Sequence, residues 1–219
     1  MSPKSPERGT NDTGALRVKR AIDVIAALTL LVLLAPVILT AALLVRAGSH
    51  GPAFYTGRRW GFRGRQFACV KLRSMYTDQE PILKRNGLDA VGDKGRPLVF
   101  QKDPRITPIG AFLRKFSIDE LPQLFNVIRG DMSLVGPRPL AISMLENYPD
   151  IRAARSVMRP GITGLWQVRN RMKNASVFDM IEDDMEYIDQ FSLMLDFKIA
   201  FLTLPRIVEP TIREGVAPD

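Results

Sequence analysis

The sequence predicts an α+β fold that is mainly helical, in which a long apolar helix precedes one compact domain. Three observations support this. Residues 24–45 are continuously apolar, strand-like runs flank a glycine-rich turn near residue 61, and several later stretches repeat apolar residues at helical spacing. A chain of 219 residues is the size expected for one domain plus one extra element. We therefore predict a tail over 1–16, a membrane helix over 17–47, the compact domain over 48–206 and a C-terminal tail over 207–219.

The apolar run 24–45 carries no charged residue. As a helix it is about 33 Å long, enough to cross the core of a bilayer, and it exceeds the apolar core of a signal peptide. Pro36 removes a backbone hydrogen bond near its middle and is expected to bend it. Residues 1–20 and 46–65 each contain five basic side chains, so charge does not orient a spanning helix. The residues alone leave two topologies open: a spanning helix, or a helix that bends at Pro36 and returns.

The elements of the compact domain follow from periodicity and turn residues. Residues 54–55 and 66–72 predict a small β-hairpin, and 77–97 predict a surface loop with one helical turn. Helices are expected over 109–115, 140–158, 177–190 and 193–204. The last of these has few charges, which fits either a core helix or an amphipathic helix lying at a membrane interface.

Composition restricts the classes of function. The net charge of +8 favours an anionic partner, such as a nucleic acid, an anionic membrane surface or a phosphate-rich substrate. Aromatic residues make up only 8% of the chain and no nucleic-acid-binding motif is present, so we expect no nucleic-acid partner. The single Cys69 cannot form an internal disulfide and is expected to pack in the core. The single His50 argues against most zinc sites and catalytic triads.

The most informative segment is 117–123, because two adjacent carboxylates, Asp119 and Glu120, lie among arginines. One interpretation is structural: Ser117 and Glu120 form a capping box for a helix that ends at Gly130. The other is a site for a cation or a phosphate. The two are compatible, since the positive end of a helix keeps a carboxylate ionised and attracts phosphate.

Two loops, 136–139 and 159–171, combine proline and glycine with arginine. Such residues fix unusual backbone shapes that can hold a guanidinium for bidentate contact with phosphate. The alternative is that these arginines are solvated turn residues. Together with the acid pair and the membrane helix, the loops indicate metal-assisted phosphoryl chemistry on a membrane-bound substrate.

Six motifs, in order over about residues 17–206, resemble the bacterial sugar transferase family, the monotopic polyprenyl-phosphate phosphoglycosyl transferases of the minimal single-domain type. They are Lys19-Arg20-x-x-Asp23, Lys71-x-Arg73-Ser74-Met75, Asp103-Pro104-Arg105-Ile106-Thr107, Asp119-Glu120-Leu121-Pro122-Gln123-Leu124-x-Asn126, Gly130-Asp131-Met132-Ser133-x-Val135-Gly136-Pro137-Arg138-Pro139 and Arg159-Pro160-Gly161-Ile162-Thr163-Gly164-Leu165-x-Gln167-Val168. Several of these motifs are long and specific.

The resemblance implies transfer of a phosphosugar from a UDP-sugar to undecaprenyl phosphate, with Mg²⁺ as cofactor. Asp119 would be the nucleophile that forms an aspartyl-phosphosugar and releases UMP. Glu120 would bind the metal and help to deprotonate the lipid phosphate. Arg114, Arg138 and Arg171 match arginines that contact phosphate. The product, undecaprenyl-diphosphate-sugar, would begin the synthesis of an exopolysaccharide or another glycan.

The resemblance also implies a re-entrant helix bent at Pro36, amphipathic helices at the interface, and an active site on the cytoplasmic side of the inner membrane. Two positions depart from the family pattern: Ala35 replaces the serine that often precedes the bending proline, and Arg169-Asn170-Arg171 replaces Asn-Gly-Arg. Two other functions remain as alternatives: a membrane-anchored basic binding protein without catalysis, and a glycosyltransferase that moves the sugar without its phosphate. A homodimer is compatible with the sequence, which identifies neither the oligomeric state nor the sugar.

Overall fold

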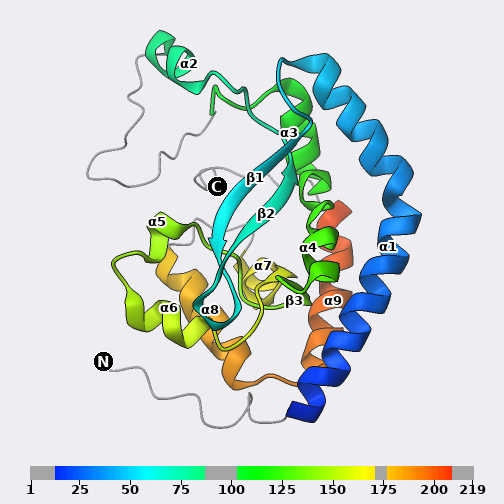
Figure 1. Ribbon diagram of the computed structural model, residues 1–219, viewed down its shortest axis with the longest axis vertical. Helices are drawn as coiled ribbons and strands as arrows, with labels where there is room; N and C mark the ends of the chain where they lie inside the picture. The colour runs from blue at the N-terminus through cyan, green and yellow to red at the C-terminus, as the bar shows by residue number, and fades with distance from the viewer. Residues whose placement is uncertain (1–12, 87–102, 171–176, 209–219) are drawn as a thin grey trace.

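The computed structural model describes residues 13–86, 103–170 and 177–208 (Figure 1). These residues are mainly helical and include two small two-stranded sheets, which confirms the predicted mainly helical α+β class. The helices are α1 (Thr13–Gly48), α2 (Gln79–Arg85), α3 (Pro108–Lys115), α4 (Gln123–Arg129), α5 (Ile142–Leu145), α6 (Pro149–Arg155), α7 (Leu165–Asn170), α8 (Val177–Asp189) and α9 (Leu193–Val208), with 3-10 turns η1 (Phe62–Gly64) and η3 (Ile118–Glu120). The strands are β1 (Phe54–Trp60), β2 (Gln66–Leu72), β3 (Ser133–Val135) and β4 (Gly161–Thr163). The predicted division into domains and tails stays a prediction.

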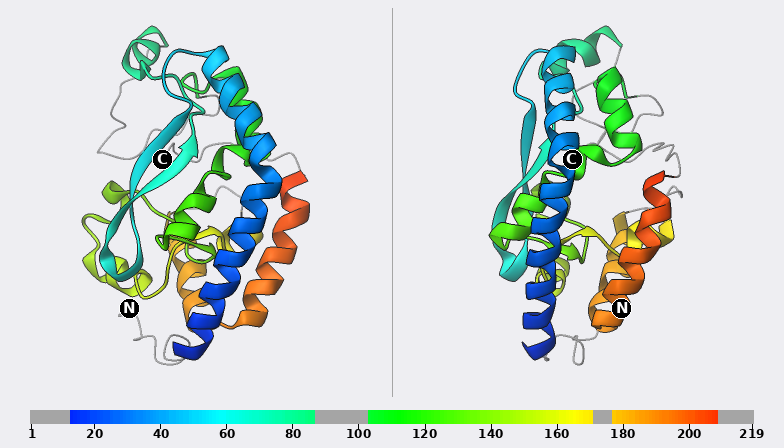
Figure 2. Two further views of the ribbon diagram at one scale, coloured as in Figure 1. Left: turned by 45° about the vertical axis from the view of Figure 1, so that its right-hand side comes forward. Right: turned by 90° about the vertical axis from the view of Figure 1, so that its right-hand side faces the viewer.

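Helix α1 runs along one whole side of the molecule and continues through Pro36 (Figures 1 and 2). It is long and apolar enough to cross a membrane. One narrow stripe of the helix is buried against the domain, at Ala27, Ile38, Ala41 and Val45. The spacing of three, four and seven residues in the latter part of this stripe keeps these side chains on one helical face. The other faces expose large apolar side chains, among them Val32, which is 75% exposed.

The N-terminal end of α1 is attached to the domain by charged side chains. Nζ of Lys19 donates to the carbonyl of Val135 at 2.9 Å and to Oδ2 of Asp196 at 2.5 Å. The carboxylate of Asp23 accepts from the hydroxyl of Ser133 at 2.6 Å. Arg20 donates to two carbonyls in the last turn of α4. These bonds connect α1 to β3, α4 and the start of α9.

The C-terminal end of α1 is attached by a different residue, the buried Arg73, which follows β2. Its guanidinium donates to the carbonyls of Val45, Ser49 and Pro52 at 3.3, 2.8 and 2.6 Å. The last carbonyls of a helix have no partner within it, so Arg73 acts as a side-chain cap. Burial, with the nearby charge of Arg46, lowers the pKa of Arg73. Both ends of α1 therefore contact the same domain.

The predicted hairpin is confirmed: β1 and β2 pair in antiparallel register from Phe54 opposite Leu72 to Trp60 opposite Gln66. In Figure 1, α4 lies between this hairpin and α1. The buried side chain of Asn126 on α4 accepts from the amide of Val70 at 2.9 Å and donates to the carbonyl of Ala68 at 2.7 Å. These bonds fix α4 against β2. The second sheet, a parallel pair of β3 and β4, was not predicted from the sequence.

The other predicted helices are found with shifted boundaries. The expected helix over 140–158 is divided into α5 and α6, while those over 177–190 and 193–204 correspond to α8 and α9. The expected loop after residue 77 contains α2, and the rest of it lies mainly outside the described residues. Cys69 is buried and packs beside Phe67, Leu124 and Val127, as expected for a core residue.

Candidate active site

The acid pair lies in a short turn between α3 and α4, and its local structure differs from the predicted capping box. Ser117 has a left-handed backbone (φ 56°, ψ 22°) and makes no capping hydrogen bond. An N-cap residue normally has an extended backbone that directs its oxygen to the helix amides, so this conformation excludes the box. Asp119 and Glu120 instead form the 3-10 turn η3, and α4 begins after Pro122. The predicted end of α4 is confirmed, since Gly130 has φ 96°.

Both carboxylates are withdrawn from solvent, with Asp119 3% and Glu120 9% exposed. Nζ of Lys71, on β2, lies 3.5 Å from Oε1 of Glu120. A cation at this distance offsets part of the cost of burying the Glu120 carboxylate. Two adjacent acids are therefore held at the edge of the hairpin with a lysine beside one of them. Lys71 belongs to one of the motifs named above, but no role was predicted for it.

Arg114 lies in the last turn of α3, the helix that precedes η3. Its Nε donates to the hydroxyl of Ser74 at 2.8 Å. The start of α3 is capped by Thr107, whose hydroxyl accepts from the amide of Gly110 at 2.9 Å. Helix α3 packs closely against the chain that follows β2 at Gly110. Only glycine fits there, because a Cβ at this position would lie 1.9 Å from the carbonyl oxygen of Ser74. This close packing fixes the helix that carries Arg114.

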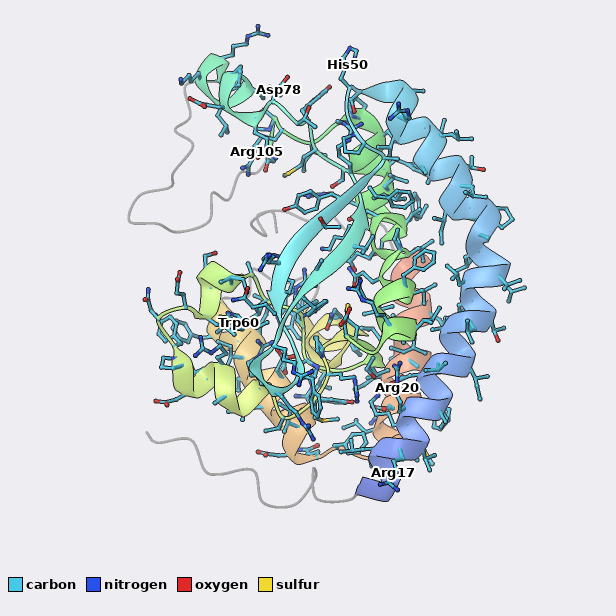
Figure 3. The ribbon with its side chains drawn as sticks, viewed as in Figure 1. Arg17, Arg20, His50, Trp60, Asp78 and Arg105 are labelled. Atoms are coloured by element: carbon cyan, nitrogen blue, oxygen red, sulfur yellow. The ribbon has the colours of Figure 1, made fainter. Side chains whose placement is uncertain are left out.

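A second ion pair adjoins Arg114. Arg105 binds the carboxylate of Asp103 with its Nε and Nη2 atoms, the latter at 2.7 Å. Burial alone would raise the pKa of Asp103, but hydrogen bonds from Arg105 and the charges of Arg105 and Arg114 outweigh it and lower the pKa. Figure 3 shows Arg105 on the segment near α2 that leads into α3. Asp103 is thus an ionised neighbour of the arginine predicted to contact phosphate.

Arg138 lies in the loop 136–139, after β3, and its main chain is fixed on both sides. Its amide donates to Oδ1 of Asp184 at 3.1 Å, and its carbonyl accepts from Nη2 of Arg155 at 2.6 Å. Asp184 and Arg155 form a buried ion pair with each other at 2.5 Å. The guanidinium of Arg138 lies over the ring of Trp166, 5.3 Å from its centroid. Sequence reasoning missed Asp184 and Arg155.

The remaining arginines of the two loops are placed as follows. Nε of Arg159 donates to the carbonyl of Gly130, and its guanidinium stacks on Phe62. Burial, together with repulsion from Arg20, lowers the pKa of Arg159. Arg169 forms a surface ion pair with Glu186. Arg171, which was predicted to bind phosphate, lies outside the described residues.

The acid pair has the chemistry that a magnesium ion requires. Mg²⁺ commonly uses one or two protein carboxylates and takes its other oxygens from substrate phosphates and water. Asp119 and Glu120 supply adjacent carboxylates in the turn that follows α3, so this donor set fits the ion with a diphosphate bound. Within residues 13–86, 103–170 and 177–208, no group of three or more His, Cys, Asp or Glu side chains forms a preassembled metal cage. Substrate oxygens would therefore have to complete the coordination.

Comparison with known proteins identifies the family. The family model described as "Bacterial sugar transferase" matches residues 14–210, which is most of the chain. The chain belongs to the bacterial sugar transferase family. The expectation of a sugar-transferring enzyme of the phosphoglycosyl transferase class is thereby confirmed.

Individual relatives agree with the family match. The chain is 40% identical over 214 residues to the "Exopolysaccharide production protein ExoY" of Rhizobium meliloti (strain 1021), covering 94% of each chain. It is 42% identical to the "Undecaprenyl-phosphate glucose phosphotransferase" of Komagataeibacter xylinus, over 86% of this chain and 35% of that one. It is 41% identical to the "UDP-glucose:undecaprenyl-phosphate glucose-1-phosphate transferase" of Caulobacter vibrioides, over 87% of this chain and 69% of that one.

Proposed function

We propose that this enzyme transfers a phosphosugar from a UDP-sugar to undecaprenyl phosphate, giving undecaprenyl-diphosphate-sugar and UMP. The observation that carries the proposal is the buried pair of Asp119 and Glu120, placed between Lys71 and the helix that carries Arg114. The names of two relatives, which specify phosphotransfer to undecaprenyl phosphate, support the reaction. The name of the Rhizobium meliloti relative supports a place in exopolysaccharide production.

The reaction has two displacements at one phosphorus. A carboxylate oxygen of Asp119 attacks the phosphorus that bears the sugar, the bond from that phosphorus to the bridging oxygen breaks, and UMP leaves. A phosphate oxygen of undecaprenyl phosphate then attacks the same phosphorus and frees the Asp119 carboxylate. Glu120 accepts the proton if the lipid phosphate arrives protonated. Because the first product leaves before the lipid reacts, the kinetics are expected to be ping-pong.

The Asp119 carboxylate and the diphosphate of the UDP-sugar are both negatively charged, so positive charge nearby must offset their repulsion. Arg114 and Arg138 bind phosphate oxygens in this proposal, with Arg171 as a third contact, and so reduce repulsion between Asp119 and the diphosphate. Glu120 is the residue that would hold Mg²⁺, which neutralises phosphate charge when it is bound. Lys71, whose Nζ lies 3.5 Å from Oε1 of Glu120, helps to hold this carboxylate in place.

We further propose that α1 enters the cytoplasmic face of the inner membrane and returns to the same face, bent at Pro36. The packing of α1 supports this topology, because Lys19 near its start binds the same domain whose Arg73 binds its end. A helix that crossed the bilayer would place its ends on opposite sides. Figure 3 shows Arg17 and Arg20 at one end and His50 just beyond the other.

Helix α9 is proposed to lie at the membrane interface as an amphipathic helix. It begins beside the N-terminal end of α1 (Figure 2), where Lys19 contacts Asp196. Ile199 is buried in the domain, whereas Phe201 on the outer side is 73% exposed, and Met194, Phe197 and Leu204 are also exposed. Exposed apolar side chains on neighbouring helices are typical of a surface that contacts lipid.

The nucleotide released identifies the reaction. Purified protein in detergent or lipid discs is incubated with Mg²⁺, undecaprenyl phosphate and a panel of UDP-sugars, and the nucleotides are separated by chromatography. Release of UMP, dependent on one of the sugars, is expected. Release of UDP would instead indicate transfer of the bare sugar. The absence of any nucleotide product with all donors would favour the binding-protein alternative. The same panel identifies the sugar.

A further inference from the structure

A fully buried ion pair lies behind the loop that carries Arg138. Asp184, on α8, has no exposed surface, and Arg155, at the end of α6, is 6% exposed. Nε and Nη2 of Arg155 both donate to Oδ2 of Asp184, at 3.2 and 2.5 Å. The pair thus joins two helices that are far apart in the sequence.

The remaining bonds of this pair are directed to a single residue. Oδ1 of Asp184 accepts the amide of Arg138, and Nη2 of Arg155 donates to the carbonyl of Arg138. Pro137 and Pro139 flank this residue, and proline restricts the backbone on each side. Both polar main-chain groups of Arg138 are therefore held by one pair of charges.

The side chain of Arg138 is restricted as well. Its guanidinium lies 5.3 Å from the ring centroid of Trp166, which is itself buried. The N–H groups of a guanidinium lie in its own plane, so stacking on an aromatic ring leaves them able to donate to phosphate oxygens. The loop, the buried pair and the ring together fix the direction in which Arg138 points.

Stability alone does not account for such a pair. Buried ion pairs are often no more stabilising than apolar side chains of the same size. Burial raises the pKa of Asp184, while the charge and hydrogen bonds of Arg155 oppose that shift. What the pair supplies that apolar side chains could not is two hydrogen bonds to the main chain of Arg138.

We propose that Asp184 and Arg155 are positioning residues that fix Arg138 for contact with the diphosphate of the UDP-sugar. The inference rests on the proposed function, in which Arg138 binds phosphate. Neither residue contacts the substrate; both act through the main chain of Arg138.

The test is a double-mutant cycle that measures the dissociation constant of UDP with Mg²⁺ and the KM of the UDP-sugar. The variants are Arg138→Ala, Asp184→Asn and the two combined. A further variant, Asp184→Asn with Arg155→Gln, removes both charges so that neither remains buried without its partner. Glu186→Gln serves as the matched control, because it breaks an ion pair on α8 that lies at the surface.

Each single variant is expected to weaken UDP binding and raise KM by about tenfold, the scale of one hydrogen bond to a charged group. The variant that combines Arg138→Ala with Asp184→Asn should bind UDP no more weakly than Arg138→Ala alone. The variant that combines Asp184→Asn with Arg155→Gln should bind UDP as Asp184→Asn does. Glu186→Gln should bind UDP as the wild type does. A merely structural role would lower the melting temperature and leave binding by the folded protein unchanged.

Two results would overturn the inference. One is unchanged UDP binding in folded Asp184→Asn protein; the other is a dissociation constant in the Arg138→Ala, Asp184→Asn double variant that rises by the product of the two single increases. Failure of the proposed function has a different signature, since the wild-type protein would then release no UMP from any donor. The wild-type assay therefore separates the two failures before any variant is compared.

Discussion

Nζ of Lys19 on α1 lies 2.5 Å from Oδ2 of Asp196 on α9, so the first and last described helices are joined by one ion pair. The hydroxyl of Tyr187 donates to the other oxygen of the same carboxylate at 2.6 Å. Burial raises the pKa of Asp196, and the charge of Lys19 opposes that shift. The lysine therefore supplies the opposite charge to a largely buried carboxylate at the junction between the apolar helix and the domain.

Replacing Lys19 by Met should destabilise the protein strongly. The substitution leaves Asp196 buried without its cation, which typically costs about 3–5 kcal/mol. Thermal unfolding in detergent measures the loss. Arg17→Met is the control, because Arg17 lies nearby on α1 and is exposed. Equal melting temperatures for the two variants would show that the pair contributes little.

Replacing Asp119 by Asn should abolish turnover while the protein stays folded and membrane-bound. An amide of the same shape cannot attack phosphorus as a carboxylate does, so no aspartyl-phosphosugar can form. UMP release in a single-turnover assay without lipid is the direct measurement. Asp189→Asn, which alters an exposed acid on α8, should keep wild-type activity. UMP release by the Asp119 variant at the wild-type rate would rule out the covalent mechanism.

Cysteines placed at Arg17 and His50 should be labelled from the same side of the membrane. Both positions are exposed at opposite ends of α1, and Cys69 is buried and can be replaced by Ala. A membrane-impermeant maleimide applied to inverted and right-side-out vesicles measures accessibility. Labelling of both sites only in inverted vesicles is expected for the re-entrant topology. Labelling of one site in each preparation would indicate a spanning helix.

Replacing Gly110 by Ala should disrupt the site from a distance. The added Cβ would lie 1.9 Å from the carbonyl oxygen of Ser74, so α3 must move away from the chain that follows β2. Arg114 would then lose its bond to Ser74, and kcat/KM should fall by about tenfold or more. Ala111→Ser, at an exposed position on the same helix, provides the comparison. Unchanged kinetics for Gly110→Ala would mean that α3 tolerates displacement.

The ion pair of Glu186 should make stability depend on pH. Hydrogen bonding from Arg169 lowers the pKa of Glu186, so the Glu186 carboxyl group binds its proton less tightly in the folded protein than in the unfolded chain. The stabilising contribution of the Glu186–Arg169 pair is therefore complete above the pKa of Glu186 in the unfolded chain, about 4.3. It is lost as the pH falls through the lower pKa of Glu186 in the folded protein. The free energies of unfolding of the wild type and Glu186→Gln should differ at pH 7 and become equal in acid. A constant difference across this range would contradict the shift.

Elements with strong local patterns could be predicted from the sequence. The apolar run predicted α1, and the strand-like residues on either side of a glycine-rich turn predicted β1 and β2. The parallel pair of β3 and β4 was missed because strands of three residues are too short to show a period. The capping box was wrong because the motif does not reveal the left-handed backbone of Ser117.

The candidate site was predicted unevenly for a related reason. Asp119, Glu120 and Arg138 belong to motifs whose residues are adjacent in sequence. The pair of Arg155 and Asp184 is separated by 29 residues and lies outside those motifs, so only the tertiary structure brings it to Arg138. Lys71 was visible within a motif, but its role depends on the packing of β2 against η3.

The attachment of α1 at both ends has a consequence for biosynthesis. The apolar helix leaves the ribosome before the domain that it packs against, and the carboxylate that Lys19 binds is made 177 residues later. Arg73, which caps the other end, is also made after the helix is complete. The helix is consequently complete before the side chains that bind its two ends exist. Its final position is set only when α9 has been synthesised, so chains truncated before α9 should insert but fail to acquire protease resistance.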